Sequence, residues 1–223
     1  MMRNIFRFAM MDFRTINIYT KNLLLMPLLG IVLTIVLRSV NMLNTYLIVI
    51  AMMMTSYPFA IAEASRLNIL YSTLPIMRRD VVAGRYLYAL LSGLAVFALG
   101  AVASALLVLL MPGLGEVEGP AFNMVMLGVY VLVVSMQYPL YFGMDYTKSK
   151  SVAYLPMMVV FLGVTLLPTL NETMNLGIDN LEALLSGNAF STPLAAGGIA
   201  VVILVVALAS AWLSCILYSR RDL

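Results

Sequence analysis

Six long apolar segments constrain this chain more than any other feature, because together they occupy more than half of its 223 residues. A bilayer core asks for about 20 apolar residues per helix, within a range of roughly 17–25. The chain is also 63% apolar and only 10% charged, against roughly 45–50% and about 25% in soluble domains. The sequence therefore predicts an all-α integral membrane protein, a single transmembrane domain over residues 1–223 with six transmembrane helices: 22–37, 42–62, 86–111, 121–143, 152–170 and 194–218.

The distribution of charge between the connections predicts the orientation of these helices. With the N-terminus in the cytoplasm, six spans bring the C-terminus back to the same side, and Arg38 is the only basic residue of thirteen that falls outside. Cytoplasmic connections of membrane proteins are enriched in Lys and Arg. We therefore expect N-in/C-in topology, with these residues inside: Arg3, Arg7, Arg14, Lys21, Arg66, Arg78, Arg79, Arg85, Lys148, Lys150, Arg220 and Arg221. The outer connections hold Glu116, Glu118, Glu172, Asp179 and Glu182.

The residue types exclude several kinds of chemistry. The chain has no histidine and one cysteine, Cys215, so it offers no histidine-ligated metal, no thiolate cluster and no Ser-His-Asp triad. It also lacks the Gly-rich lysine loop that cradles nucleotide phosphates. No charge lies near the middle of a predicted span, whereas ion-coupled transporters usually carry intramembrane ionisable groups. We expect a protein that is not an enzyme, binds no cofactor or metal, and has no nucleic-acid partner.

Residues 1–20 are too interrupted to cross a membrane, and they have the pattern of an amphipathic interfacial helix. Its basic residues fall on one stripe, opposite Asp12, which lies among apolar residues. Such a helix would place its basic stripe against lipid phosphates, and Asp12 would pair with a cation elsewhere in the protein. The alternative is a flanking segment whose basic residues only set the topology. The stripe comprises Arg3, Arg7, Arg14 and Lys21.

The cytoplasmic connection over residues 63–85 has a pattern of its own. Four apolar residues recur at i, i+3, i+4 and i+7, which indicates a short amphipathic helix that Ser65 could cap and Pro75 would end. Such a helix can dock into a groove on a soluble partner. Packing on its own bundle or on the lipid surface explains the pattern equally well. The apolar residues are Leu67, Leu70, Tyr71 and Leu74, and the charged residues Arg78, Arg79 and Asp80 follow.

Small residues and tyrosines mark further candidate contacts within the bundle. Residues 100–104 and 207–211 have small residues at both ends, a spacing that permits close helix packing, more often inside one chain than between chains. Four tyrosines lie near the inner membrane face, where an aromatic belt is expected and a substrate gate is the alternative. They are Tyr138, Tyr141, Tyr146 and Tyr154.

The connection between the second and third spans resembles the corresponding segment of type-2 ABC exporter permeases. An acidic residue, Glu63, ends the second span, and the string Leu70-Tyr-Ser-Thr-Leu-Pro-Ile-Met-Arg-Arg-Asp-Val-Val-Ala-Gly-Arg-Tyr86 leads into the third. Thr73 departs from the usual Ser-Leu-Pro of that family. The start at Asp12-Phe13-Arg14 and the basic-acidic tail over residues 218–222 are also similar. Small bacterial permeases, including those of the phenol-soluble modulin exporter and of bacteriocin or lantibiotic self-protection systems, resemble the chain most.

This resemblance implies a permease subunit in a bacterial cell membrane, working as a pair with the same or a homologous permease. A separate dimer of ABC ATPase subunits would bind ATP and Mg²⁺. The cargo would be an amphipathic peptide or lipid-like molecule, residues 1–20 would form an elbow helix, and residues 171–193 would form an extracellular connection with small helices. The coupling segment to the ATPase would comprise Glu63, Arg66, Leu67, Leu70, Tyr71, Leu74, Pro75, Arg78, Arg79 and Asp80.

A different class of function is compatible with the same docking helix. A membrane scaffold or assembly factor could bind a cytosolic protein without transporting anything. The two functions differ in whether a partner ATPase hydrolyses ATP in response to cargo.

Overall fold

The computed structural model describes residues 2–17, 25–37, 40–65, 77–111, 120–174 and 193–221, and these residues form seven helices and no strand. A helix lies over each predicted span, so the prediction of an all-helical fold is confirmed. The helices are α1 (Met2–Asn17), α3 (Leu25–Leu37), α4 (Val40–Ala64), α6 (Arg78–Leu110), α7 (Pro120–Gly143), α8 (Tyr146–Met174) and α10 (Pro193–Ser219).

Four of these helices are long and apolar enough to cross a membrane. The qualifying segments are Leu43–Ala64, Arg78–Leu110, Met124–Gly143 and Ala200–Ser219, among the residues that the structure describes. The other two predicted spans correspond to α3, with 13 helical residues, and to α8, with 29. The described residues therefore support a membrane protein with at least these four membrane-spanning helices.

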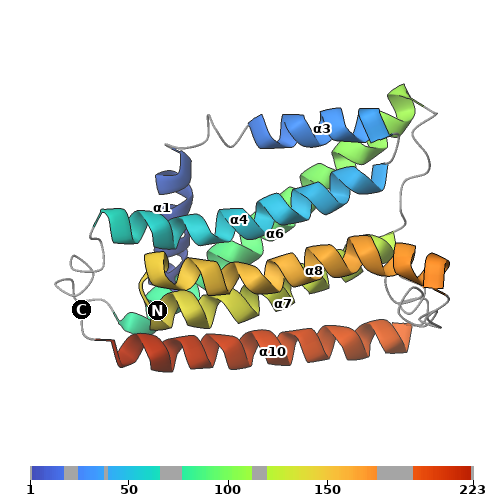
Figure 1. The fold of residues 1–223 in the computed structure, drawn as a ribbon. Helices are drawn as coiled ribbons and strands as arrows, with labels where there is room; N and C mark the ends of the chain where they lie inside the picture. The colour runs from blue at the N-terminus through green and yellow to red at the C-terminus, as the bar shows by residue number, and fades with distance from the viewer. Residues whose placement is uncertain are drawn as a thin grey trace.

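Helices α4 and α7 form the centre of the bundle. Helix α7 packs against α10, α8, α4 and α6, and helix α4 packs against α3, α6, α7 and α8. Figure 1 shows these helices running side by side, with α3 and α10 on opposite flanks and α1 crossing near one end. The C-termini of α4, α7 and α10 and the N-termini of α6 and α8 therefore meet at the end that α1 crosses, which we call the α1 end.

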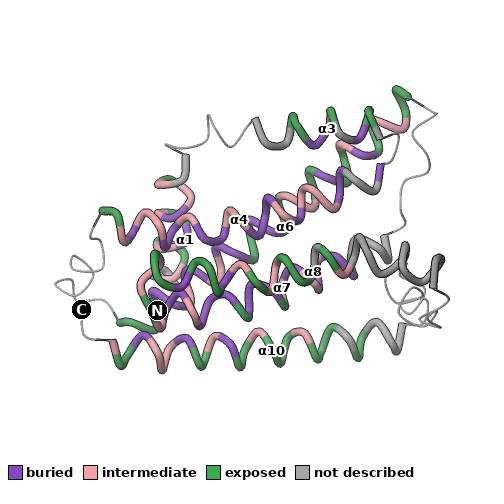
Figure 2. The backbone as a smooth tube through the Cα atoms, in the orientation of Figure 1, coloured by how far each residue is buried: buried purple, intermediate pink, exposed green. Residues whose placement is uncertain are grey.

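Exposed positions recur along α10 (Figure 2), and many exposed positions of α6 and α10 carry large apolar side chains. Such a surface would be unfavourable in water and is stable against lipid tails. On α6 and α10 the large exposed residues include Leu99, Val102, Leu106, Leu109, Leu110, Val201, Val202, Leu204, Val205, Leu208 and Trp212.

Helix α1 turns its charged stripe outward and packs its other face on α6. Ala9 is 1% exposed, whereas Arg7 and Arg14 are exposed. The close crossing uses Gly84 of α6, where an added Cβ would lie 2.6 Å from the Phe8 Cβ atom. Helix α1 thus has the amphipathic pattern expected from the sequence. Arg3 belongs to α1, and Lys21 lies outside the described residues.

The structure extends one expected element and corrects another. Helix α6 begins at Arg78, eight residues before the predicted span over residues 86–111, so Arg78, Arg79 and Asp80 form its first turn. Its 33 residues extend about 50 Å at 1.5 Å per residue, which exceeds the bilayer core of roughly 30 Å. Tyr138 and Tyr141 do not belong to a lipid-facing aromatic belt, because they are 0% and 2% exposed inside the bundle.

Candidate functional site

Polar side chains join the helix ends at the α1 end of the bundle. The carboxylate of Glu63, at the end of α4, accepts the backbone N–H of Thr147 at 3.1 Å and the Thr147 hydroxyl at 2.5 Å. Thr147 lies in the first turn of α8, where backbone N–H groups have no partner within the helix and the helix dipole favours a negative charge. Glu63 therefore caps α8 from a different helix.

At the C-terminal end of α10 the charges are reversed, and an arginine binds the free backbone carbonyls. Arg78 of α6 donates to the backbone carbonyls of Tyr218, Ser219 and Arg221 at 2.9, 2.9 and 3.0 Å. Carbonyls in the last turn of a helix lack partners, and a cation there is favoured by the helix dipole. Arg78 therefore ties the start of α6 to the end of α10.

The tight connection between α7 and α8 completes this arrangement. Arg221 forms an ion pair with Asp145 and donates to the Met144 carbonyl at 3.3 Å. Lys148 also approaches Asp145, at 4.0 Å. We call Glu63, Arg78, Asp145, Thr147 and Arg221 the polar clamp, because its contacts link the ends of α4, α6, α7, α8 and α10.

A layer of aromatic rings lies next to the polar clamp and surrounds a buried arginine. Arg85 is 5% exposed, and its guanidinium lies 4.1 Å from the centre of the Phe59 ring and 5.6 Å from that of Phe142. Tyr138 donates its hydroxyl to the Arg85 carbonyl at 3.3 Å. Such stacking stabilises a desolvated guanidinium by about 2 kcal/mol or more.

Asp12 of α1 brings the opposite charge toward Arg85. Its side chain is 6% exposed, and burial raises the pKa of Asp12 to about 6, although the positive charge of Arg85 opposes this rise. The two charges lie on helices that pack directly against each other. Arg85 therefore offsets part of the cost of burying the acidic residue on the apolar face of α1.

The raised pKa of Asp12 predicts that acid stabilises the protein. The folded state holds the Asp12 proton more tightly than the unfolded state does, so this contribution is complete below about pH 4 and is lost as the pH rises through 6. Between pH 4.5 and pH 8 we expect a loss of about 2 kcal/mol. Thermal unfolding in detergent should show this loss for the natural sequence and a smaller pH dependence for Asp12→Asn. Equal pH dependence in both proteins would contradict the prediction.

The structure places only part of the predicted coupling segment. Glu63, Arg78, Arg79 and Asp80 lie on the helix ends that flank it, and Asp80 is buried while Arg79 is exposed. Arg66, Leu67, Leu70, Tyr71, Leu74 and Pro75 lie outside the described residues, as does most of residues 171–193.

Sequence reasoning did not find three members of the polar clamp. Asp145, Thr147 and Arg221 stand far from Glu63 and Arg78 in the sequence, and no spacing rule relates them. The available signal was Asp145, the first charged residue after the apolar run over residues 121–143, because a tight turn there must place the end of one helix beside the start of the next.

Comparison with family models supplies the decisive observation. The model described as ABC-2 family transporter protein matches residues 10–219, which include the six helices from α3 to α10 and the second half of α1. The chain belongs to the ABC-2 transporter family. No curated protein and no solved structure matched the chain in the comparisons.

Membership of the ABC-2 family gives the polar clamp its context. The chain is a multi-pass membrane protein and the membrane component of an ABC-2 transporter. ABC-2 permeases lack an ATPase domain and work with ATPase subunits. The helices that flank residues 66–76 are α4 and α6, and both contribute side chains to the polar clamp.

Proposed function

We propose that this ABC-2 permease exports an amphipathic peptide or lipid-like cargo across a bacterial cell membrane. It does so as a pair with a second copy or a homologous permease, above a dimer of ABC ATPase subunits that binds ATP and Mg²⁺. Its six spans have N-in/C-in topology, α1 is the elbow helix, and residues 66–76 carry the coupling helix. The absence of charge in the middle of the spans supports an apolar or amphipathic cargo.

The polar clamp is the observation that carries the coupling part of this proposal. Glu63 lies three residues before the predicted coupling helix region, residues 66–76, and Arg78 lies two residues after that region. Glu63 contacts α8, and Arg78 contacts α10. A push on residues 66–76 would therefore move α4 and α6 together with two further helices. ATP-driven closure of the ATPase dimer would shift the bundle between inward- and outward-open populations in this way.

Substitutions in the predicted coupling helix test the proposal. Leu70→Asp and Tyr71→Asp would place a carboxylate on the apolar face that grips the ATPase. Co-purification of the permease with its partner ABC ATPase should fall at least tenfold, and cargo-stimulated ATP hydrolysis should disappear. Lys150→Glu, an exposed charge change at the α1 end on α8, is the control and should leave both unchanged.

The outcomes separate transport from scaffolding. Normal assembly and hydrolysis in both variants would refute the coupling assignment. Stable assembly of the natural permease with an ATPase whose activity no amphipathic peptide or lipid stimulates would favour a scaffold or assembly factor. Thr147→Val adds a test of the polar clamp, because it removes one hydrogen bond to Glu63 without changing residues 66–76. Assembly of the permease with the ATPase should persist, while the stimulation of ATP hydrolysis by cargo should fall.

A further inference from the structure

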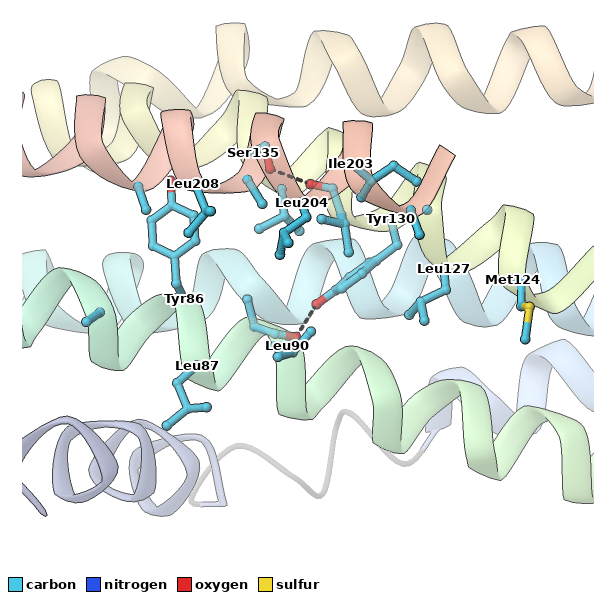
Figure 3. Close-up of a pocket in the computed structure, with 18 of the residues that line it drawn as sticks. Tyr86, Leu87, Leu90, Met124, Leu127, Tyr130, Ser135, Ile203, Leu204 and Leu208 are labelled. Carbon is cyan, nitrogen blue, oxygen red and sulfur yellow. Dashed lines mark hydrogen bonds between the residues drawn. The ribbon is translucent and has the colours of Figure 1, made fainter. Parts of the chain in front are cut away.

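An apolar groove of about 680 Å³ opens on the side of the bundle between α6 and α10, with α7 as its floor (Figure 3). Its walls include Ala83, Leu87 and Leu90 on α6 and Leu204, Ala207 and Ala211 on α10. The two small-residue patterns found in the sequence thus have different roles. Gly100 lies against Leu47 and Asn44 of α4, whereas Ala207 and Ala211 leave space on the groove wall.

The polar groups around the groove already have partners within the protein. The Tyr86 hydroxyl is hydrogen-bonded to the hydroxyls of Ser210 and Ser214, at 2.6 and 3.0 Å. Tyr130 donates to the Ala89 carbonyl at 2.6 Å. An occupant of the groove would therefore meet carbon surface almost throughout. This favours a hydrocarbon chain over a peptide backbone, which would leave its own polar groups unpaired.

A positively charged residue, Arg79, lies in line with the groove at the α1 end. Arg79, Ala83, Tyr86 and Leu90 are spaced i, i+4, i+7 and i+11, so they share one face of α6. Arg79 is exposed and has no ion-pair or hydrogen-bond partner among the described residues. Its positive charge lies close enough to α10 to interact electrostatically with the Cys215 thiol. Its neighbour Arg78 is instead held by the end of α10.

We propose that this groove holds an acyl chain of an anionic phospholipid, with the lipid phosphate at Arg79. An apolar channel that leads to a guanidinium with no partner in the described part of the chain is complementary to a molecule with a hydrocarbon tail and an anionic head. The membrane supplies such molecules directly to the lipid-facing sides of α6 and α10. The proposed N-in/C-in topology would place this lipid in the inner leaflet, but the site itself does not depend on that topology.

Lipid retention by the purified permease tests this site without an ATPase or a cargo. The protein is reconstituted in vesicles of equal phosphatidylglycerol and phosphatidylcholine and extracted in mild detergent, and native mass spectrometry counts the lipids retained. The natural sequence should prefer phosphatidylglycerol. Arg79→Gln should reduce this preference about fivefold, and Arg79→Lys should keep most of it.

Two matched pairs of variants distinguish the groove from general lipid attraction. Ala207→Phe should fill the groove and lower retention of both lipids, whereas Ala209→Phe adds the same ring to an exposed position on the other side of α10 and should not. Lys150→Gln removes one exposed charge at the α1 end away from the groove and should leave the preference intact.

Three results would overturn the lipid site. They are unchanged retention in Ala207→Phe, an unchanged phosphatidylglycerol preference in Arg79→Gln, and efficient disulfide cross-linking of Ala207→Cys between two copies in the membrane. The last result would make the groove an interface between permease subunits. None of them bears on assembly with the ATPase, so the proposed function would stand or fall separately.

Discussion

Replacing Arg85 with methionine should destabilise the purified permease by about 3–5 kcal/mol at pH 8. The substitution keeps an unbranched chain of similar length but removes the charge that offsets part of the cost of burying Asp12 and that stacks on Phe59. Removing one member of a buried pair of charges costs this much because the other charge stays buried without compensation. For a chain of this size the loss corresponds to roughly 6–20 °C in the midpoint of thermal unfolding.

The pH dependence of this loss identifies its cause. Asp12 can escape as the neutral acid at low pH, so Arg85→Met should be less damaging at pH 5 than at pH 8. Asp12→Asn in the Arg85→Met background should recover part of the stability at pH 8. Arg79→Met makes the same chemical change at an exposed position of the same helix, and it should cost no more than about 0.5 kcal/mol. Failure of Asp12→Asn to recover any stability would show that these two charges are not coupled.

The apolar pattern was sufficient to predict the helices but not their ends. The spans over residues 42–62, 121–143 and 194–218 agree with α4, α7 and α10 within a few residues at each end. Helix α6 begins eight residues before the predicted span over residues 86–111, because Arg78, Arg79 and Asp80 of the cytoplasmic connection form its first turn. Asp80 in the first turn is favoured by the helix dipole, and the helix continues beyond the bilayer core.

The candidate site was less predictable, because its contacts join residues that are distant in the sequence. Glu63 was singled out by resemblance, but its partner Thr147 stands 84 residues away. Arg85 was counted only as one of the inner positive charges. Its burial between Phe59 and Phe142 follows from how α4, α6 and α7 pack, which hydrophobic periodicity on one helix cannot give. Asp12 did signal such a partner, since a carboxylate on an apolar helix face requires compensation.

Gly84 offers the second large effect, because it allows α1 to dock on α6. A Cβ atom at this position would lie 2.6 Å from the Phe8 Cβ atom and 3.1 Å from the Ile5 carbonyl oxygen. Neither atom is the far end of a flexible side chain, so in Gly84→Ala the whole of α1 must move. Overpacking of this kind costs about 1–3 kcal/mol. That cost would raise the population with α1 undocked by about 5–150-fold.

Cysteine accessibility on the buried face of α1 measures this undocking. With Cys215 replaced by serine, Ala9→Cys introduces a single thiol at a position that is 1% exposed. Its reaction with a water-soluble maleimide should accelerate at least fivefold in Gly84→Ala.

Gly100→Ala is the matched control, since the one close contact of its added Cβ is with the end of the Leu47 side chain, at 2.9 Å, which can rotate away, and the Asn44 Oδ1 atom lies at an ordinary contact distance of 3.5 Å. Undocking also exposes Asp12 to water, which lowers its pKa toward the ordinary value. The acid stabilisation of the protein should therefore shrink in Gly84→Ala and persist in Gly100→Ala. Equal labelling rates in the two glycine variants would mean that α1 does not depend on close approach at Gly84.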